Sequence, residues 1–208
     1  MLANSTFIIV SFICIMLLVA WIIPRRHNLP CPSWLGWMVE QDNPLSKINK
    51  AKNIIKFLDI KRGMIVLDFG CGPGRLSIPL AHEVGETGKV IALDIQTKML
   101  DKVKIKAQKE NLKNITFLHA AAGEGALEKN NFDRAVLITV IGEIPNQKKA
   151  LEEIYASLKP GGILSIAEII FDPHYQRYDK IFQLTKDVGF KKVNLFSDWF
   201  AYNLILKK

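Results

Sequence analysis

Two aspartates flank a run of closely spaced glycines in the first half of the chain. Asp68 begins the segment DFGCGPG at residues 68–74, and Asp94 ends the next apolar run. Glycines let a backbone turn tightly and approach a ligand without the obstruction of a Cβ atom. A carboxylate placed like Asp94 can accept the hydroxyls of a ribose, and Asp68 can attract an ammonium group. We therefore expect this region to bind a nucleoside that carries charged groups.

The glycine spacing argues against two other nucleotide-binding loops. A dinucleotide fingerprint reads G-x-G-x-x-G, but here the third glycine, Gly74, comes one residue early and Arg75 stands in its expected place. A Walker loop would need Gly-Lys-Ser or Gly-Lys-Thr, which the sequence lacks. Nicotinamide carriers and nucleoside triphosphates therefore fit this loop poorly.

Alternating apolar strands and amphipathic helices must position these residues. The hydrophobic pattern predicts strands at residues 64–69, 89–94, 115–119, 132–140, 163–170, 191–196 and 201–206, and helices at 46–58, 75–84, 97–111, 146–158 and 176–188. Such alternation indicates a parallel α/β sheet covered on both faces. The short connection between the last two strands indicates an antiparallel hairpin at the sheet edge.

The D-x-G-x-G-x-G pattern together with Asp94 resembles motif I and the acidic loop of class I S-adenosylmethionine-dependent methyltransferases. The resemblance extends from about Lys47 to the C-terminus and includes LKPGGILSIAE at residues 158–168. It implies S-adenosyl-L-methionine as cofactor and a Rossmann-like, seven-stranded, mostly parallel domain over residues 46–208. The cofactor contacts that we expect are Asp68, Gly70, Cys71, Gly72, Gly74, Asp94, Ile95, Ala121, Ala122 and Thr139.

Within that class the chain is similar to the ubiquinone and menaquinone biosynthesis methyltransferases, with one departure. Those enzymes usually read Gly-Asp-Ala after the third strand, with the acid on the adenine amino group, whereas this chain reads AAAGE at residues 120–124. Adenine recognition would then depend on backbone groups near Ala122 and on Glu124. More loosely, the chain also resembles membrane-bound alkyl thiol methyltransferases.

Polar residues after the fourth and fifth strands are the candidates for the transfer step. Displacement at a sulfonium methyl has a neutral leaving group, and orientation alone contributes up to ~7–11 kcal/mol, so a general base is optional. We assign catalytic roles to Glu143 and to His174, whose type of side chain titrates near neutrality. The alternatives without a catalytic role are that Glu143 is an acid at the start of a helix and that His174 is a solvated histidine in a loop. We expect the acceptor pocket to include Trp34, Trp37, Glu168, Asp172 and Tyr175.

Composition supports one globular domain without a metal or disulfide framework. The chain has 208 residues, of which 49% are hydrophobic and 23% charged. Its three cysteines, Cys14, Cys31 and Cys71, have neither zinc-ligand nor disulfide spacing, which favours a reducing compartment and predicts no metal. The net charge of +8 permits an anionic membrane or nucleic acid as partner.

Residues 1–26 predict a membrane anchor. Residues 1–24 carry no charged side chain, and residues 7–23 are apolar except for Ser11. Seventeen helical residues span ~26 Å, and inclusion of residues 4–6 makes the segment long enough to cross a bilayer. A cleaved signal peptide is the alternative, but the basic n-region and a clear cleavage site are missing. We predict a single crossing by residues 4–23.

The charge after the anchor predicts its orientation. Residues 25–62 hold eight Lys and Arg against three acids, so the positive-inside rule places the folded domain on the cytoplasmic side. Residues 27–45 form a Pro- and Trp-rich juxtamembrane segment. Its cluster of Trp34, Trp37 and Met38 either lies on the membrane surface or covers a pocket.

These observations predict a membrane-anchored S-adenosylmethionine-dependent methyltransferase. The expected acceptor is small and lipophilic: a quinone-like ring, a phospholipid amine or a thiol. Methylation of ribosomal RNA or protein is the alternative that the basic charge permits, but the anchor and the lack of Asn/Asp-Pro-Pro-Tyr after the fourth strand argue against nucleic acid. A cofactor-binding membrane module without turnover is the second alternative. The oligomeric state is left open.

Overall fold

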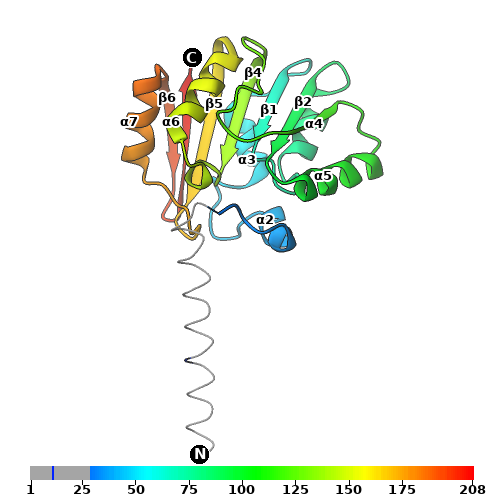
Figure 1. Ribbon diagram of the computed structural model, residues 1–208, viewed down its shortest axis with the longest axis horizontal. Helices are drawn as coiled ribbons and strands as arrows, with labels where there is room; N and C mark the ends of the chain where they lie inside the picture. The colour runs from blue at the N-terminus through cyan, green and yellow to red at the C-terminus, as the bar shows by residue number, and fades with distance from the viewer. Residues whose placement is uncertain (1–10, 12–28) are drawn as a thin grey trace, which may run out of the picture.

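A seven-stranded sheet runs through the centre of the molecule, with helices on both of its faces (Figure 1). This computed structural model describes residue 11 and residues 29–208. The strands are β1 (Ile65–Phe69), β2 (Lys89–Asp94), β3 (Ile115–His119), β4 (Phe132–Ile138), β5 (Leu158–Ile169), β6 (Lys191–Ser197) and β7 (Ala201–Lys207). The α-helices are α2 (Gly36–Glu40), α3 (Ala51–Leu58), α4 (Ser77–Val84), α5 (Thr97–Lys109), α6 (Gln147–Ser157) and α7 (Tyr178–Val188), and the 3-10 helices are η1 (Ser33–Leu35) and η2 (Ile141–Glu143).

The strand order confirms the predicted mostly parallel α/β sheet with an antiparallel C-terminal edge. The order is β3-β2-β1-β4-β5-β7-β6, and the strands from β3 to β5 are all parallel. β7 runs antiparallel to both β5 and β6 and is almost entirely buried. β6 forms the outer edge, where the exposed Lys191 and Lys192 hinder pairing with a second sheet.

The direction of chain travel reverses between β1 and β4. From β1 the chain moves outward through β2 to β3 and then crosses back to β4 on the other side of β1. In open parallel sheets, ligands bind beyond the carboxyl ends of the strands at such a switch point. The topology thus directs attention to the residues that follow β1 and β4.

Two hydrophobic cores lie on opposite faces of the sheet. One core lies between the sheet and helices α3, α4 and α5. The other lies between the sheet and helices α6 and α7, and side chains of β7 belong to it. Along β1, Val66 joins the first core, whereas Leu67 and Phe69 join the second. The period of two along a strand therefore turns Asp68 toward the α4 side.

Two predicted boundaries were wrong by five residues, whereas the others differ by two residues or fewer. The helix predicted over residues 46–58 begins only at Ala51, because Asp42 accepts the backbone N–H of Ala51 (2.8 Å) and Ser46 Oγ accepts that of Asn49 (3.3 Å). These side chains stabilise turns ahead of the helix. β5 begins at Leu158 rather than at residue 163, with a register irregularity opposite β4 around Pro160, which has no N–H to donate.

The predicted anchor, residues 4–23, lies outside the described residues apart from Ser11. Within the described part, no helix combines the length and apolar character that a bilayer crossing requires. The predicted division into residues 1–26, 27–45 and 46–208 stays a prediction.

Candidate active site

The glycine loop connects β1 to α4 at the carboxyl end of the sheet. The N–H groups of Gly70 (2.8 Å) and Cys71 (2.9 Å) both donate to the carbonyl of Leu93 in β2. Gly70, Gly72 and Gly74 have φ angles of +71°, +50° and +91°, in the left-handed region that glycine tolerates best. The local sequence therefore folds into a tight turn fixed to the neighbouring strand.

The three glycines have different surroundings. A Cβ atom on Gly70 would lie 2.6 Å from Val140 Cγ1, and one on Gly74 would lie 3.2 Å from Val103 Cγ1. A Cβ on Gly72 would meet nothing within 4 Å. Gly70 and Gly74 thus allow close packing within the protein, whereas Gly72 borders open space in which a ligand fits.

Asp68 is buried beneath the N-terminus of α4. Its Oδ2 accepts the hydroxyl hydrogen of Ser77, the first residue of α4, at 2.5 Å. Burial raises the pKa of Asp68 to about 6, while the bond from Ser77 and the nearby Arg75 oppose the rise. A buried carboxylate with few counter-charges favours a cationic ligand. The ammonium group of S-adenosyl-L-methionine meets that requirement.

Asp94 ends β2 beside the glycine loop. Its Oδ2 accepts the N–H of Gly72 (2.9 Å), and its Oδ1 accepts that of Gln96 (2.8 Å). Burial raises its pKa, and both backbone bonds oppose that rise. An ionised carboxylate offers about four acceptor sites, so sites remain for two ribose hydroxyls. The residues present therefore fit the nucleoside end of S-adenosyl-L-methionine.

The remaining predicted cofactor residues lie along the same edge. Ile95 follows Asp94 with an exposed side chain. Ala121 and Ala122 are half-buried in the loop after β3. Thr139, after β4, has a φ angle of +53°, and its hydroxyl donates to the carbonyl of Ile138 (2.7 Å). Their contacts with a cofactor stay predictions.

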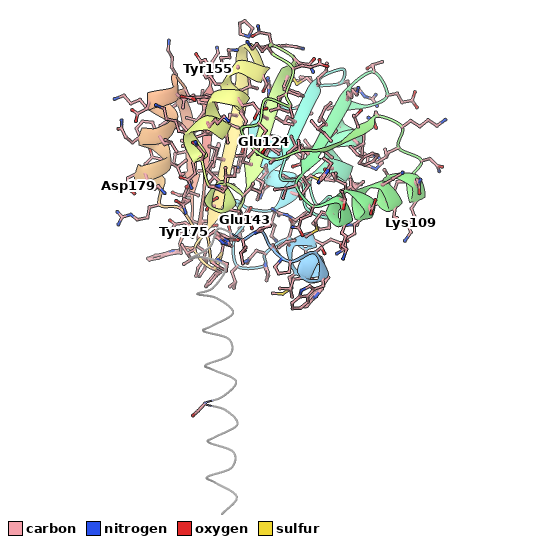
Figure 2. The ribbon with its side chains drawn as sticks, viewed as in Figure 1. Lys109, Glu124, Glu143, Tyr155, Tyr175 and Asp179 are labelled. Carbon is pink, nitrogen blue, oxygen red and sulfur yellow. The ribbon has the colours of Figure 1, made fainter. Side chains whose placement is uncertain are left out.

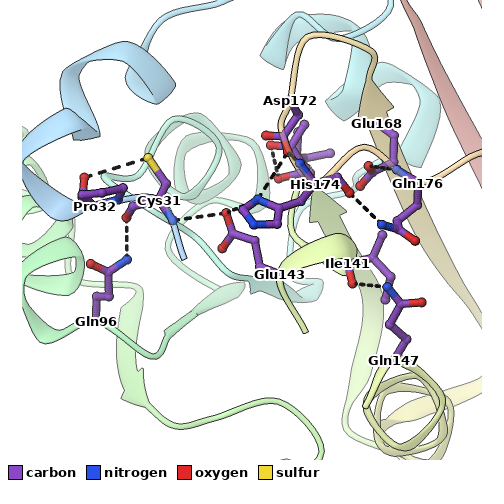
Figure 3. A network of polar contacts seen from close by, with 12 residues as sticks. Cys31, Pro32, Gln96, Ile141, Glu143, Gln147, Glu168, Asp172, His174 and Gln176 are labelled. Carbon is purple, nitrogen blue, oxygen red and sulfur yellow. Dashed lines mark hydrogen bonds and ion pairs between the residues drawn. The ribbon is translucent and has the colours of Figure 1, made fainter. Parts of the chain in front are cut away.

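A second polar group forms where β4 and β5 end (Figure 3). Glu143 closes η2 after β4, and Asp172 and His174 lie in the loop after β5. His174 Nδ1 lies 3.7 Å from Asp172 Oδ1 and 3.9 Å from Glu143 Oε1. Gly142 permits this approach, because a Cβ there would collide with the carbonyl of His174. The structure thus brings together the two residues predicted to be catalytic.

Burial controls the acidity of these side chains. Burial, reinforced by Asp172, raises the pKa of Glu143 to about 8. Burial also raises the pKa of Asp172, whereas the backbone and side chain of His174 oppose that shift. His174 Nε2 is buried and finds no hydrogen-bond partner among the described residues.

Glu168 lies deeper, at the end of β5. Its Oε2 accepts the N–H of Gln176 (3.0 Å), while its Oε1 is buried without a partner in the described part of the chain. Burial raises its pKa well above the ordinary value. Tyr175, predicted to line the same pocket, packs edge-on against Tyr202 with ring centroids 6.3 Å apart. Figure 2 shows Tyr175 and Glu143 at the same end of the sheet.

Residues 31–42, which we call the strap, lie across the carboxyl end of the sheet and connect the two polar groups (Figures 1 and 3). The N–H of Cys31 donates to Glu143 Oε1 (3.2 Å), and its carbonyl accepts from Gln96 Nε2 (2.8 Å). Farther along, Lys102 Nζ donates to the carbonyl of Ser33. The strap therefore connects the residues after β2, next to Asp94, with the residues after β4, at Glu143.

Trp34 and Trp37 belong to the strap but lie apart from the buried group. Their side chains are 74% and 62% exposed. In this structure both side chains therefore lie largely in solvent. That they contact an acceptor stays a prediction.

Sequence analysis missed the residues that hold the acids and the strap in place. Ser77 is a polar residue on an otherwise apolar helix face, and this contrast with its neighbours was an available signal. Gln96 stands two residues after Asp94, but nothing in the sequence indicates its bond to Cys31. Contacts between positions 65 residues apart arise only from the tertiary fold.

The described residues contain no group of three or more His, Cys, Asp or Glu side chains arranged to hold a metal ion.

Comparison with known proteins identifies the family. A family described as a methyltransferase domain matches residues 60–197, about two thirds of the chain. A curated relative from Oceanobacillus iheyensis, named demethylmenaquinone methyltransferase, is 38% identical over 111 residues, which cover 53% of this chain and 47% of the relative. A Bacillus cereus protein of the same name is 36% identical over the same coverage. The match spans about half the length of these relatives.

A solved structure agrees with the fold. The crystal structure of a SAM-dependent methyltransferase from Aquifex aeolicus superposes with a TM-score of 0.76 at 24% identity, covering 86% of this chain and 99% of that one. At this identity the likeness supports the fold, while the family match and the fit of the glycine loop support the cofactor. The chain therefore belongs to the methyltransferase domain family.

Proposed function

We propose that the enzyme methylates a small lipophilic acceptor with a quinone-like ring and that residues 4–23 anchor it in a membrane. The observation that carries the acceptor site is the buried group of Glu143, Asp172 and His174, in which His174 Nε2 lacks a partner among the described residues. This group follows β4 and β5, next to the switch point where the cofactor residues gather.

The cofactor, when bound, supplies an electrophilic methyl group on a sulfonium, whose departure leaves a neutral thioether. Asp94 would hold the ribose hydroxyls and Asp68 the ammonium group, each from the end of a strand. Residues fixed on rigid strands restrict the angle of approach, and orientation of this kind lowers the barrier of a displacement reaction. The open space beside Gly72 admits the cofactor to the loop.

A hydroxyl or thiol acceptor loses a proton as it accepts the methyl group. His174 Nε2 is the proposed proton acceptor. Its other nitrogen, Nδ1, lies 3.7 Å from Asp172 Oδ1, so an imidazolium that forms there is stabilised by the Asp172 carboxylate. Glu143, with its pKa raised to about 8, is a hydrogen-bond donor to the acceptor below that pH.

One observation supports a quinone-like acceptor over the other lipophilic classes, and a second supports a lipophilic acceptor of any class. The curated relatives are named for demethylmenaquinone, a quinone. The apolar N-terminal run would hold the domain at a bilayer, where a lipophilic ring is concentrated. A phospholipid amine or a thiol would produce a different labelled product and is distinguished by the same experiment.

The experiment incubates the purified full chain with isotopically labelled cofactor and a total lipid extract, with and without added demethylated quinol. Mass spectrometry should detect a labelled quinol. A labelled phospholipid or thiol would contradict the quinone-like ring and identify a different class of acceptor. Labelled RNA or protein in a matched extract would contradict the proposal of a small lipophilic acceptor. Cofactor binding without transfer to any fraction would favour a module that does not turn over.

Matched variants test the proposed transfer residues. We expect His174→Ala and Glu143→Gln to lower kcat by about 10²-fold or more, the usual contribution of a proton-transferring group, with cofactor affinity nearly unchanged. Glu86→Gln is the control, because Glu86 is an exposed acid in the turn between α4 and β2, outside this group and outside the expected cofactor contacts. Wild-type turnover in both active-site variants would remove them from the mechanism.

Localisation has its own test. The full chain should stay in the membrane fraction after alkaline carbonate washing, and a variant without residues 1–26 should not. Protease added outside intact cells should leave the domain uncut if it lies on the cytoplasmic side. Release of the full chain by carbonate would exclude the proposed transmembrane anchor and leave the methyltransferase assignment intact.

A further inference from the structure

Large hydrophobic side chains are exposed together at the carboxyl end of the sheet. They come from three segments: the strap and the turn after it, the loop after β5, and the turn between β6 and β7. We call this group the aromatic rim; its members are Trp34, Trp37, Met38, Leu45, Phe171 and Trp199. Trp199 is 93% exposed, which is unusual for the largest apolar side chain in proteins.

Specific contacts connect these three segments. The N–H of Ile170 donates to the carbonyl of Phe200 (2.8 Å), and the rings of Phe171 and Phe200 stack with centroids 5.4 Å apart. The hydroxyl of Ser46 donates to Asp198 Oδ2 at 2.9 Å. The loop after β5, the β6–β7 turn and the chain after the strap are therefore held against one another. Figure 1 shows them at the same end of the molecule.

We propose that the aromatic rim inserts into the headgroup region of a lipid bilayer, as a second membrane contact beside the proposed anchor. Tryptophan is enriched where protein crosses the membrane–water interface, and contiguous exposed apolar groups mark interaction sites. The apolar run ends at residue 23, and the described chain begins at Leu29 at the rim's own end. Six residues reach at most about 20 Å, so the tether would hold the rim close to the bilayer.

The charges of the strap are compatible with anionic headgroups. Two acids of the strap are paired with cations: Glu40 with Lys106 Nζ (2.7 Å) and Asp42 with Arg75 (3.0 Å). Lys47 is exposed two residues after Leu45. A basic residue near an anionic surface contributes about 1 kcal/mol of attraction. The strap thus presents apolar groups to the lipid with its two acids neutralised.

The effect of rim insertion on methyl transfer rests on the proposed function. The strap and the loop after β5 carry both the rim and the contacts of Glu143 and His174. An inserted rim would therefore bring the transfer site to the bilayer surface. A lipophilic acceptor could then move from lipid to protein without crossing open water.

Tryptophan quenching tests the insertion directly. The chain contains four tryptophans, and Trp21→Phe removes the one in the predicted anchor. In that background, full-length variants that retain only Trp34, Trp37 or Trp199, with the others changed to Phe, are reconstituted in phosphatidylcholine and phosphatidylglycerol vesicles. The control has all four tryptophans changed to Phe and Val193→Trp added, because Val193 is an exposed residue on β6 outside the rim.

We expect lipids brominated on their acyl chains to quench each rim tryptophan at least threefold more strongly than the control, and vesicles to protect the rim from aqueous acrylamide. Quenching no stronger than in the control would overturn the proposal. So would protection from acrylamide in lipid-free protein, which would indicate that a second copy of the chain covers the rim. All three rim positions are exposed, so Phe is tolerated there.

A second measurement separates this inference from the proposed function. Quenching requires no turnover, so an inactive enzyme with quenched rim tryptophans would contradict only the methyl-transfer proposal. In the full chain that retains Trp34 as its only tryptophan, Phe171→Ser with Trp199→Ser should lower the quenching of Trp34 by brominated lipids at least threefold, while cofactor affinity, measured by calorimetry, is unchanged. Undiminished quenching in this variant would contradict the rim.

Discussion

At the scale of single residues, position along a strand determines which acids can contact a ligand. Asp68 and Asp94 each stand at the carboxyl end of a buried parallel strand, where backbone N–H groups and a helix N-terminus converge. A carboxylate in the middle of either strand would be buried without such partners, at a cost of several kcal/mol. The same location that satisfies these acids also presents them to a ligand.

Asp94→Ala should weaken cofactor binding by about 10-fold or more. Hydrogen bonds to a charged group contribute about 1.5–3 kcal/mol, and 1.4 kcal/mol corresponds to a factor of ten. Titration calorimetry with S-adenosyl-L-methionine measures the change. Asp101→Ala, an exposed acid on α5, is the matched control. Wild-type affinity in Asp94→Ala would refute the ribose assignment.

Gly70→Ala should mainly lower the stability of the fold, whereas Gly72→Ala should mainly lower cofactor affinity. At Gly70 the new methyl would collide with Val140, so we expect a large loss of thermal stability. At Gly72 it would meet only open space, so the fold should lose about 1–2 kcal/mol from the left-handed backbone alone. Cofactor affinity should fall more than stability at Gly72. Calorimetry and thermal melts of both variants compare the two quantities, and unaltered affinity in Gly72→Ala would mean that the open space is not the cofactor's.

At the scale of elements, the strap is the part of the site that depends on few contacts. Its helices, η1 and α2, have three and five residues, too short for independent stability. Its side-chain and backbone bonds to Gln96, Lys102 and Glu143 therefore determine its position. Segments of this type open at low free energy, which suits an element that must admit a cofactor.

Gln96→Ala should loosen the strap without removing the cofactor contact of Asp94. The backbone N–H of Gln96 still reaches Asp94, but the bond from its side chain to the Cys31 carbonyl is lost. Amides of residues 31–42 should exchange hydrogen several-fold faster in mass spectrometry. Gln108→Ala, exposed elsewhere on α5, should leave that exchange unchanged. Equal exchange in both variants would show that this bond does not hold the strap.

At the scale of the whole molecule, the buried acids make stability depend on pH. Glu143 has an ordinary pKa of 4.5 in the unfolded chain and about 8 in the folded one, because burial disfavours its charged form. Between those pH values the folded state binds a proton that the unfolded state has released. The stability that this proton contributes is complete below pH 4.5 and is lost as the pH rises through about 8.

We therefore expect the cofactor-free protein to lose stability as the pH rises from about 5 to about 8, and Glu143→Gln to reduce that loss. Denaturant unfolding at a series of pH values measures the free energy of unfolding for both proteins. Glu124→Gln should retain the wild-type profile, since Glu124 is exposed. A wild-type slope in Glu143→Gln would assign the effect to other groups.

The sequence by itself determined the sheet, the cofactor loop and its two acids. Strand alternation and glycine spacing are local patterns, and local sequence is sufficient to encode a strand, a tight turn and the residue that follows each. Their residue types and their places after the fourth and fifth strands also pointed to Glu143 and His174. Neither the pattern nor the resemblance indicated how far apart they would lie or which atoms would face each other.

The tertiary structure decided what depends on contacts between distant segments. Burial of Glu143, the approach of Gly142 to the His174 carbonyl and the bond between Cys31 and Gln96 all join residues far apart in the chain. Packing also left Trp34, Phe171 and Trp199, which come from three distant segments, exposed to solvent. A periodic pattern shows which side of an element is apolar, but only packing determines whether another element covers that side.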